Sequence, residues 1–176
     1  MRLPPPPGGL SFLDHRPELL AAFNHFYGTL WSHGVLDQPT KEVARLRNAR
    51  VTGCGICRNL RFASARDAGL SEELVDKIVD GYKHSALPER FKLAARLTDV
   101  IIGATPSDVP QDLRDVLLAE FTPAELVELA LTAAIAQGFS KAAVAWGPAP
   151  DIPLTVVPTP APPERQFSGA VPSASM

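Results

Sequence analysis

Cysteine is scarce in this sequence: two of its 176 residues are cysteines, and both lie in one motif, Cys54-Gly55-Ile56-Cys57. The histidines are scattered rather than paired at the H-x₃₋₅-H spacing of zinc sites: His15, His25, His33 and His84. A structural zinc ion normally needs four Cys or His ligands, and no second C-x-x-C is present, so we expect no metal ion and no other cofactor. Two interpretations of the motif remain, a redox pair or an inert buried pair.

Basic tracts and long apolar spans are also missing. Lys and Arg are interspersed with Asp and Glu, and the formal net charge is -2, so we expect no nucleic-acid partner. We find no apolar span suited to crossing a membrane, and residues 1–10 contain no signal-peptide core. These absences predict a cytoplasmic protein that does not bind membranes. In that reducing compartment, a C-x-x-C pair is more typical of a catalytic or redox-sensing site than of a structural disulfide.

Proline is concentrated near the two ends of the chain. Because proline supplies no backbone N–H group, these segments are poorly suited to helices and sheets. We therefore expect an N-terminal arm at 1–14 and, at 148–176, an extended tail that is dispensable for folding. The hydrophobic fraction of 45% over 176 residues suits a single domain, which we place at 15–147.

Helix signals fill the predicted domain and indicate an all-α, single-domain helical bundle. The predicted helices are 17–32, 40–53, 54–69, 71–81, 89–103, 110–121 and 123–146. Strand-like alternation is missing outside the short stretch 154–157. The last helix starts with a capping box, Thr122-Pro123-Ala124-Glu125. It is apolar around much of its circumference, so we expect it to be central or to lie between subunits.

The predicted helix 54–69 places both cysteines and one arginine on a common face. Cys54, Cys57 and Arg61 stand at positions i, i+3 and i+7, which form one stripe on a helix. The start of a helix offers unpaired N–H groups and the arginine adds positive charge, and both favour a thiolate. Glu42 stands in the first turn of the preceding helix, after a candidate cap, Thr40. Its carboxylate either serves helix electrostatics alone or faces the site.

The sequence resembles the alkylhydroperoxidase-D-like, carboxymuconolactone decarboxylase family over about residues 15–147. In that family a glutamate stands twelve residues before a C-x-x-C pair, as Glu42 does before Cys54. Three further segments support the resemblance: Ala68-Gly69-Leu70-Ser71-Glu72, Phe91-Lys92-Leu93-Ala94 and Phe121-Thr122-Pro123-Ala124-Glu125-Leu126-Val127-Glu128-Leu129. The resemblance implies an all-helical protomer that assembles into a homo-oligomer, as a dimer, trimer or hexamer.

The resemblance also implies a chemistry for this site. In peroxidase members the second cysteine, here Cys57, attacks the peroxide, and the first, here Cys54, resolves the sulfenate. Protons are relayed by the glutamate, here Glu42, and by a histidine four residues after the second cysteine. Arg61 stands in place of that histidine, and a guanidinium keeps its proton, so it cannot alternate as acid and base. We therefore expect reactive thiols but weak peroxidase turnover, unless His84 supplies the proton.

Three functions are compatible with these patterns. The leading one is a thiol-dependent oxidoreductase that reduces a peroxide or disulfide substrate and is recycled by an external thiol reductant. The second is decarboxylation of a lactone acid, in which Arg61 or another cation holds a carboxylate. The third is not enzymatic: a helical oligomer that senses oxidation or binds an apolar ligand. Peroxide consumption, thiol titration and the oligomeric state distinguish the three.

Overall fold

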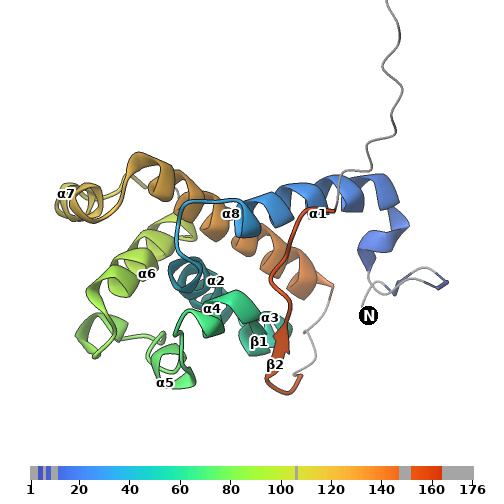
Figure 1. The fold of residues 1–176 in the computed structure, drawn as a ribbon, viewed down its shortest axis with the longest axis horizontal. Coiled ribbons are helices and arrows are strands. Elements are labelled where there is room, and N and C mark those ends of the chain that lie inside the picture. Colours follow the sequence, from blue (N-terminus) through green and yellow to red (C-terminus); the bar gives the residue numbers. More distant parts are fainter. Residues whose placement is uncertain (1–3, 6, 9–11, 106, 147–151, 164–176) are drawn as a thin grey trace, which may run out of the picture.

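The chain folds into a mostly helical body with two short strands at one edge (Figure 1). The structure is a computed structural model that describes residues 4–5, 7–8, 12–105, 107–146 and 152–163. The remaining parts of the predicted arm and tail lie outside the described residues. In chain order the elements are η1 (Phe12–His15), α1 (Pro17–Ser32), α2 (Gln38–Thr52), α3 (Gly55–Asn59), β1 (Leu60–Phe62), α4 (Ala63–Asp67), α5 (Glu72–Val75), η2 (Tyr82–His84), α6 (Glu89–Ile101), α7 (Gln111–Glu120), α8 (Pro123–Ala145) and β2 (Thr155–Val157).

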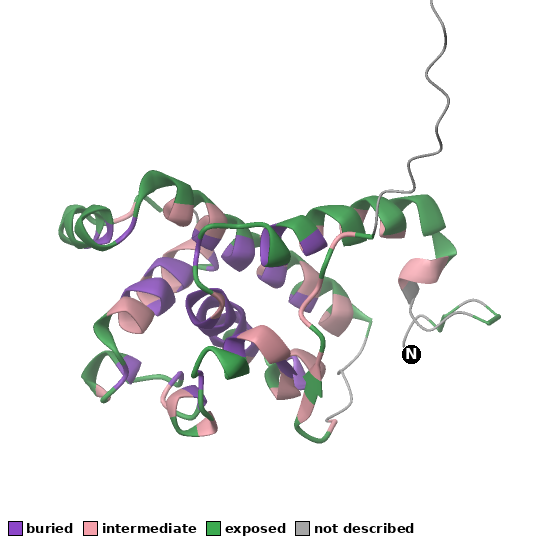
Figure 2. Cartoon of the chain, in the orientation of Figure 1, coloured by how far each residue is buried: buried purple, intermediate pink, exposed green. Residues whose placement is uncertain are grey.

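Helix α2 forms the centre of the fold, surrounded by the other helices (Figure 2). Residues 39–49 are all buried, and several of them are charged: Lys41, Glu42, Arg45 and Arg47. Burying an ion is unfavourable unless it is paired and hydrogen-bonded. The neighbouring helices supply some of the partners, since Lys41 Nζ lies 3.0 Å from Glu128 Oε2 and Arg47 Nε lies 2.6 Å from Asp99 Oδ1. The charges of α2 therefore help to join it to α8 and α6.

Helix α8 lies beside α2, which occupies the centre of the fold, whereas its apolar sequence predicted that α8 would be central or would lie between subunits. Its start is as predicted, because Thr122 Oγ1 accepts from Glu125 N at 3.3 Å and Glu125 Oε2 accepts from Thr122 N at 2.8 Å. Further along, α8 buries Leu129 and Ala133, whereas Val127 and Leu131 remain exposed. Apolar content alone did not identify the central helix, which is α2, a helix whose buried charges find partners on its neighbours.

The helix that carries the cysteines is much shorter than predicted. Helix α3 ends at Asn59, β1 follows, and α4 begins at Ala63, so the predicted continuous helix 54–69 is wrong. The interruption coincides with parallel pairing between β1 and β2, in the register Leu60↔Thr155, Arg61↔Val156 and Phe62↔Val157. Successive side chains of a strand point to opposite faces. The predicted stripe of Cys54, Cys57 and Arg61 therefore does not form.

The described part of the predicted tail lies against the helical domain. Strand β2 pairs with β1, so the expectation of an all-α fold is corrected to a mostly helical fold with one two-stranded parallel sheet. The sequence around 154–157 has the β-branched residues of a strand, but its partner was hidden inside a predicted helix. Residues 60–62 and 155–157 are far apart in the chain, so their pairing depends on how the helices between them fold.

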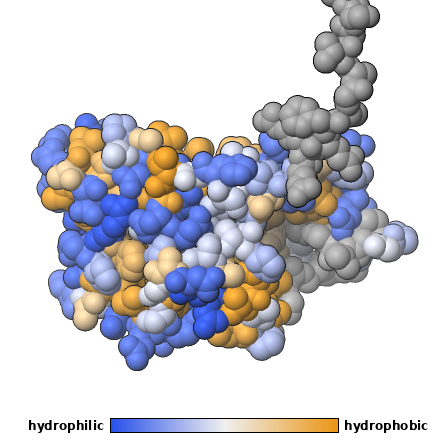
Figure 3. Space-filling view, viewed as in Figure 1, coloured by the Kyte–Doolittle hydropathy of each residue, from blue (hydrophilic) through white to orange (hydrophobic). Residues whose placement is uncertain are grey.

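Apolar and hydrophilic side chains form separate patches on the face drawn in Figure 3. Among the helices of the described ranges, none combines the length and the hydropathy needed to span a membrane.

Candidate functional site

The two cysteines are joined as a disulfide at the start of α3. Their Cα atoms are 5.3 Å apart, within the range usual for disulfides. Cys54 is the N-cap of α3, and its Sγ accepts a hydrogen bond from the Cys57 backbone N–H at 3.3 Å. Cys54 is completely buried, whereas Cys57 is partly exposed. A molecule that approaches this pair therefore meets Cys57 first.

Cys57 lines an apolar cavity of about 450 Å³. Aromatic side chains from α1, β1 and α8 form much of its wall: Phe23, Tyr27, Phe62 and Phe139. The Phe23 and Phe139 rings stack with their centroids 4.3 Å apart. Residues of the C-terminal segment, Val157, Pro158 and Pro160, complete the lining. The cavity therefore suits a ligand with an apolar body whose reactive group points at the Cys57 sulfur.

Arg45 is the arginine that binds the Cys57 carbonyl and lines the cavity. Its Nη1 donates to the Cys57 carbonyl at 2.7 Å and its Nη2 donates to the Leu60 carbonyl at 2.7 Å. From the sequence we expected Arg61, one helical turn after Cys57, to provide the positive charge near the thiol. In the structure Arg45 of α2 provides the positive charge next to Cys57. The only local signal for Arg45 was its position three residues after Glu42, a spacing at which helical side chains pair.

Glu42 does not line the cavity, but it binds Arg45, which does. Its two carboxylate oxygens accept from Arg45 Nε at 2.7 Å and Nη2 at 2.6 Å, and Oε1 also accepts from the Phe62 backbone N–H at 3.2 Å. Burial by itself lowers the pKa of the Arg45 guanidinium, but the Glu42 carboxylate raises it above its ordinary value. The structure therefore brings Glu42 to the site through Arg45, in a buried ion pair.

Groups that exchange protons near neutral pH are missing from the described wall of the cavity, which contains neither a carboxylate nor a histidine. Burial raises the pKa of Tyr27, so its phenol remains protonated. Ser140 Oγ donates to Cys57 Sγ at 3.6 Å and itself accepts from Asn48 Nδ2 at 3.0 Å. Sequence reasoning missed Ser140 and Asn48, because nothing in their local sequence shows that α2 and α8 meet at the cysteines.

Arg61 and His84 are not brought to the cavity. The Arg61 guanidinium binds Glu72, with Nη2 2.9 Å from Oε2, and its Nη1 donates to the Arg58 carbonyl at 2.6 Å. Leu60 and Phe62 line the cavity, whereas Arg61 between them does not. His84 is exposed in η2 and is also absent from the lining. Of the four predicted site residues, the structure therefore groups Cys54, Cys57 and Glu42 and leaves Arg61 outside.

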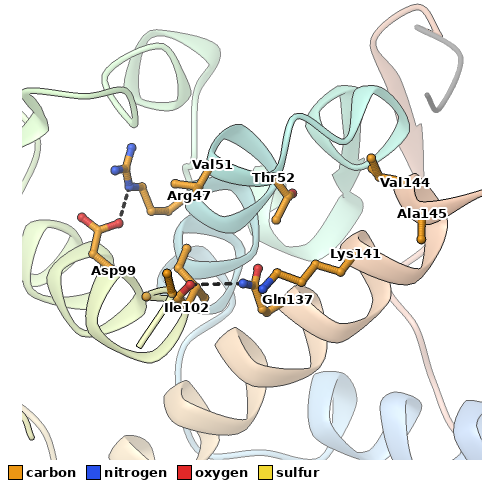
Figure 4. A pocket seen from close by; sticks show the side chains of 11 residues that line it. Arg47, Val51, Thr52, Asp99, Ile102, Gln137, Lys141, Val144 and Ala145 are labelled. Carbon is orange, nitrogen blue, oxygen red and sulfur yellow. Dashed lines mark hydrogen bonds and ion pairs between the residues drawn. The ribbon is translucent and has the colours of Figure 1, made fainter. Parts of the chain in front are cut away.

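A larger cavity of about 620 Å³ lies between the C-terminal parts of α2, α6 and α8 (Figure 4). Two of its three charged residues, Arg47 and Asp99, bind each other, and the third is Lys141. Gln137 Nε2 donates to the Ile102 carbonyl at 3.1 Å. Neither cysteine lines this cavity. Within the described ranges, no group of three His, Cys, Asp or Glu side chains is placed to hold a metal ion. The smaller cavity, which Cys57 lines, is therefore the candidate functional site.

Comparison with known proteins identifies related sequences and a related fold. The model of the carboxymuconolactone decarboxylase family matches residues 17–98. Two curated relatives, uncharacterized proteins from the CDC 1551 and H37Rv strains of Mycobacterium tuberculosis, are each 38% identical over 117 residues, which are 66% of this chain. The match covers 41% of each relative, so the chain spans about two fifths of their length.

The fold is shared by a solved structure. It is a crystal structure from Agrobacterium tumefaciens of a protein of unknown function that has been suggested to be an antioxidant defence protein, AhpD. The TM-score is 0.69 with 20% sequence identity, and the match covers 80% of this chain and 97% of that chain. At this level of identity the match shows a common fold.

Proposed function

We infer from the match of the carboxymuconolactone decarboxylase family model to residues 17–98 that the chain belongs to this family. From this premise we propose that it is a thiol-dependent oxidoreductase that reduces a disulfide or peroxide substrate. One observation carries the proposal: the sulfurs of Cys54 and Cys57 are bonded, and Cys57 lines an apolar cavity while Cys54 is buried behind it. This asymmetry assigns the attacking thiolate to Cys57 and the resolving thiol to Cys54. No metal or other cofactor enters the proposed chemistry.

With a disulfide substrate, the steps balance without further reactants. The Cys57 thiolate attacks one substrate sulfur, forms a mixed disulfide and releases the other substrate sulfur as a thiolate. Cys54, as a thiolate, then attacks Cys57 Sγ, forms the Cys54–Cys57 disulfide and releases the second substrate thiolate. The substrate gains two electrons and the two protons given up by the cysteine thiols. An external dithiol reductant subsequently reduces the pair and becomes a disulfide itself.

The geometry favours a disulfide substrate over a peroxide. A departing thiolate is a good leaving group, because the pKa of an ordinary thiol is about 8.5. Hydroxide leaving from a peroxide is the conjugate base of water, whose pKa is about 15.7, so it needs a proton donor. The described cavity wall offers only neutral hydroxyl groups for this task, those of Ser140 and Tyr27. Disulfide exchange is therefore the reaction that this site supports best.

Peroxide reduction is the second candidate, supported by the Ser140 hydroxyl that donates to Cys57 Sγ. In that reaction Cys57 becomes a sulfenic acid and the peroxide leaves as an alcohol or water. Cys54 then displaces water from the sulfenic acid and forms the disulfide. Decarboxylation of a lactone acid has less support, because Arg45, the cation on the described wall, is already paired with Glu42.

Thiol titration with single-cysteine variants tests this assignment. We expect the reduced wild type to reduce a small aromatic disulfide, release two equivalents of thiol per chain and end as an intramolecular disulfide. Cys54→Ser should release one equivalent and remain as a mixed disulfide on Cys57, which mass spectrometry detects. Cys57→Ser should release less than a tenth of an equivalent on the same timescale. If the two variants show the opposite pattern, or if the wild type keeps both thiols free, the proposal is wrong.

Peroxide consumption by the same reduced proteins, with a dithiol reductant in excess, separates the two substrate classes. We expect the rate with an organic hydroperoxide to be at least tenfold below the rate with the aromatic disulfide. A faster reaction with the hydroperoxide would reverse the order of the two candidates.

A further inference from the structure

The C-terminal segment 152–163, called the strap below, covers one side of the cavity that contains Cys57. Its residues Val157, Pro158 and Pro160 belong to the cavity wall. We propose that the strap determines which molecules reach Cys57 Sγ, admitting small or slender reagents and excluding bulky ones. This inference rests on the proposed function of Cys57 and adds a specificity-determining element to it.

The strap is attached directly beside the cysteine turn. Strand β2 pairs with β1, which follows α3 without an intervening loop. Asn59, the last residue of α3, donates from Nδ2 to the Ile152 carbonyl at 2.8 Å. At the other side of the pairing, Thr159 Oγ1 accepts from the Ser64 backbone N–H at 3.0 Å. The strap is therefore held in one register, with Val157 and the following prolines placed over the cavity.

The strap is held mainly by hydrogen bonds and contributes no residue to the buried core. Every residue from 152 to 163 is at least partly exposed, and the hydrophobic core cluster is built from α2, α6, α7, α8 and the segments between them. Regions with little buried apolar surface open at low free energy compared with the global unfolding of a domain. The strap can therefore move away from the cavity while the helices remain packed.

The strap backbone packs directly against a glycine of α1, Gly28. A Cβ atom at Gly28 would lie 2.2 Å from the Ala161 carbonyl carbon and 2.2 Å from Pro162 N, so only glycine lets the strap backbone lie this close to the helix. Alanine favours a helix more than glycine does. Gly28→Ala should therefore displace the strap without weakening α1. Gly138 in α8 provides a matched control, because a Cβ atom there meets no atom within 4 Å.

The test measures how fast Cys57 reacts with two maleimides of different bulk, N-ethylmaleimide and N-(1-pyrenyl)maleimide. All proteins carry Cys54→Ser, so that Cys57 is the single thiol, and each rate is divided by the rate of the same reagent with free glutathione. We compare four chains: the parent, Gly28→Ala, Gly138→Ala and a chain that ends at residue 151. Circular dichroism of each chain reports whether the helices are intact.

In the parent we expect the pyrenyl reagent to react at least tenfold more slowly than the ethyl reagent. The quantity compared is the ratio of the ethyl rate to the pyrenyl rate. Gly28→Ala and the shortened chain should each lower this ratio at least fivefold, whereas in Gly138→Ala the ratio should stay within twofold of the parent value. An unchanged ratio in both Gly28→Ala and the shortened chain would overturn the role of the strap. Loss of helical signal in the shortened chain would overturn it as well, because the strap would then be part of the folding core.

The same assay separates this inference from the proposed function. If neither maleimide modifies Cys57 in any of the four chains, Cys57 is not an accessible nucleophile and the proposed function fails. If both maleimides modify Cys57 equally well in the parent, the proposed function stands and the strap does not select by size.

Discussion

Replacing Glu42 by glutamine removes the charge of a buried ion pair while keeping the size of the side chain. Glu42 is completely buried and accepts three hydrogen bonds, two from Arg45 and one from the Phe62 backbone N–H. In Glu42→Gln, one oxygen becomes an NH₂ group that faces donors, and the Arg45 guanidinium keeps a buried charge without its counter-ion. Breaking a buried pair in this way typically costs about 3–5 kcal/mol. We expect a loss of this size in the free energy of unfolding.

Urea denaturation of the reduced protein measures the loss. With an m-value of about 2 kcal/mol/M, a loss of about 3–5 kcal/mol lowers the urea midpoint by roughly 1.5–2.5 M. Glu73→Gln is the matched control, since Glu73 is an exposed residue of α5. Its replacement should change the free energy of unfolding by less than about 0.5 kcal/mol.

A double variant decides whether the loss comes from the pair itself. Glu42→Gln combined with Arg45→Met removes both charges, so the combined loss should be smaller than the sum of the single losses by about 1–3 kcal/mol. If Glu42→Gln is as stable as wild type but fails to turn over substrate, the carboxylate acts in proton transfer rather than in a structural pair. That result would refute the structural role of Glu42 as the counter-ion of Arg45.

Two further predictions concern ion pairs outside the cavity. Burial raises the pKa of Glu128, but two backbone N–H groups of the α1–α2 loop and the Lys41 ammonium outweigh burial and hold this pKa below its usual value. A depressed carboxyl pKa adds stability above the unfolded-state pKa of about 4.3, and this stability is lost as pH falls through the folded-state value. When the pH is lowered from 7 to 3, the urea midpoint of Glu128→Gln should therefore decrease less than the urea midpoint of wild type. Arg61→Ala should change the rate of Cys57 alkylation less than twofold, because the Arg61 guanidinium binds Glu72 instead of the cavity; a tenfold slower reaction would restore Arg61 to the site.

Local signals in the sequence determined where most helices begin and that the two cysteines lie close enough to pair. The capping box at Thr122, proline at the start of α1 and the left-handed Gly53 at the end of α2 act through neighbouring backbone groups, so a few residues suffice to predict them. The C-x-x-C spacing likewise brings two sulfurs together within one turn, and the structure joins Cys54 to Cys57. Such features depend on contacts between residues close in the chain.

Only the tertiary structure decided which side chains surround the cysteines. Arg45 rather than Arg61 binds the Cys57 carbonyl and lines the cavity, because β1 interrupts the predicted helix to pair with a strand that comes almost a hundred residues later. Helix α2 can occupy the centre of the fold because its buried charges meet partners on α6 and α8, such as Asp99 and Glu128. The free energy of burying an ion depends on the partner it meets after folding, and a linear pattern of residues does not specify that partner.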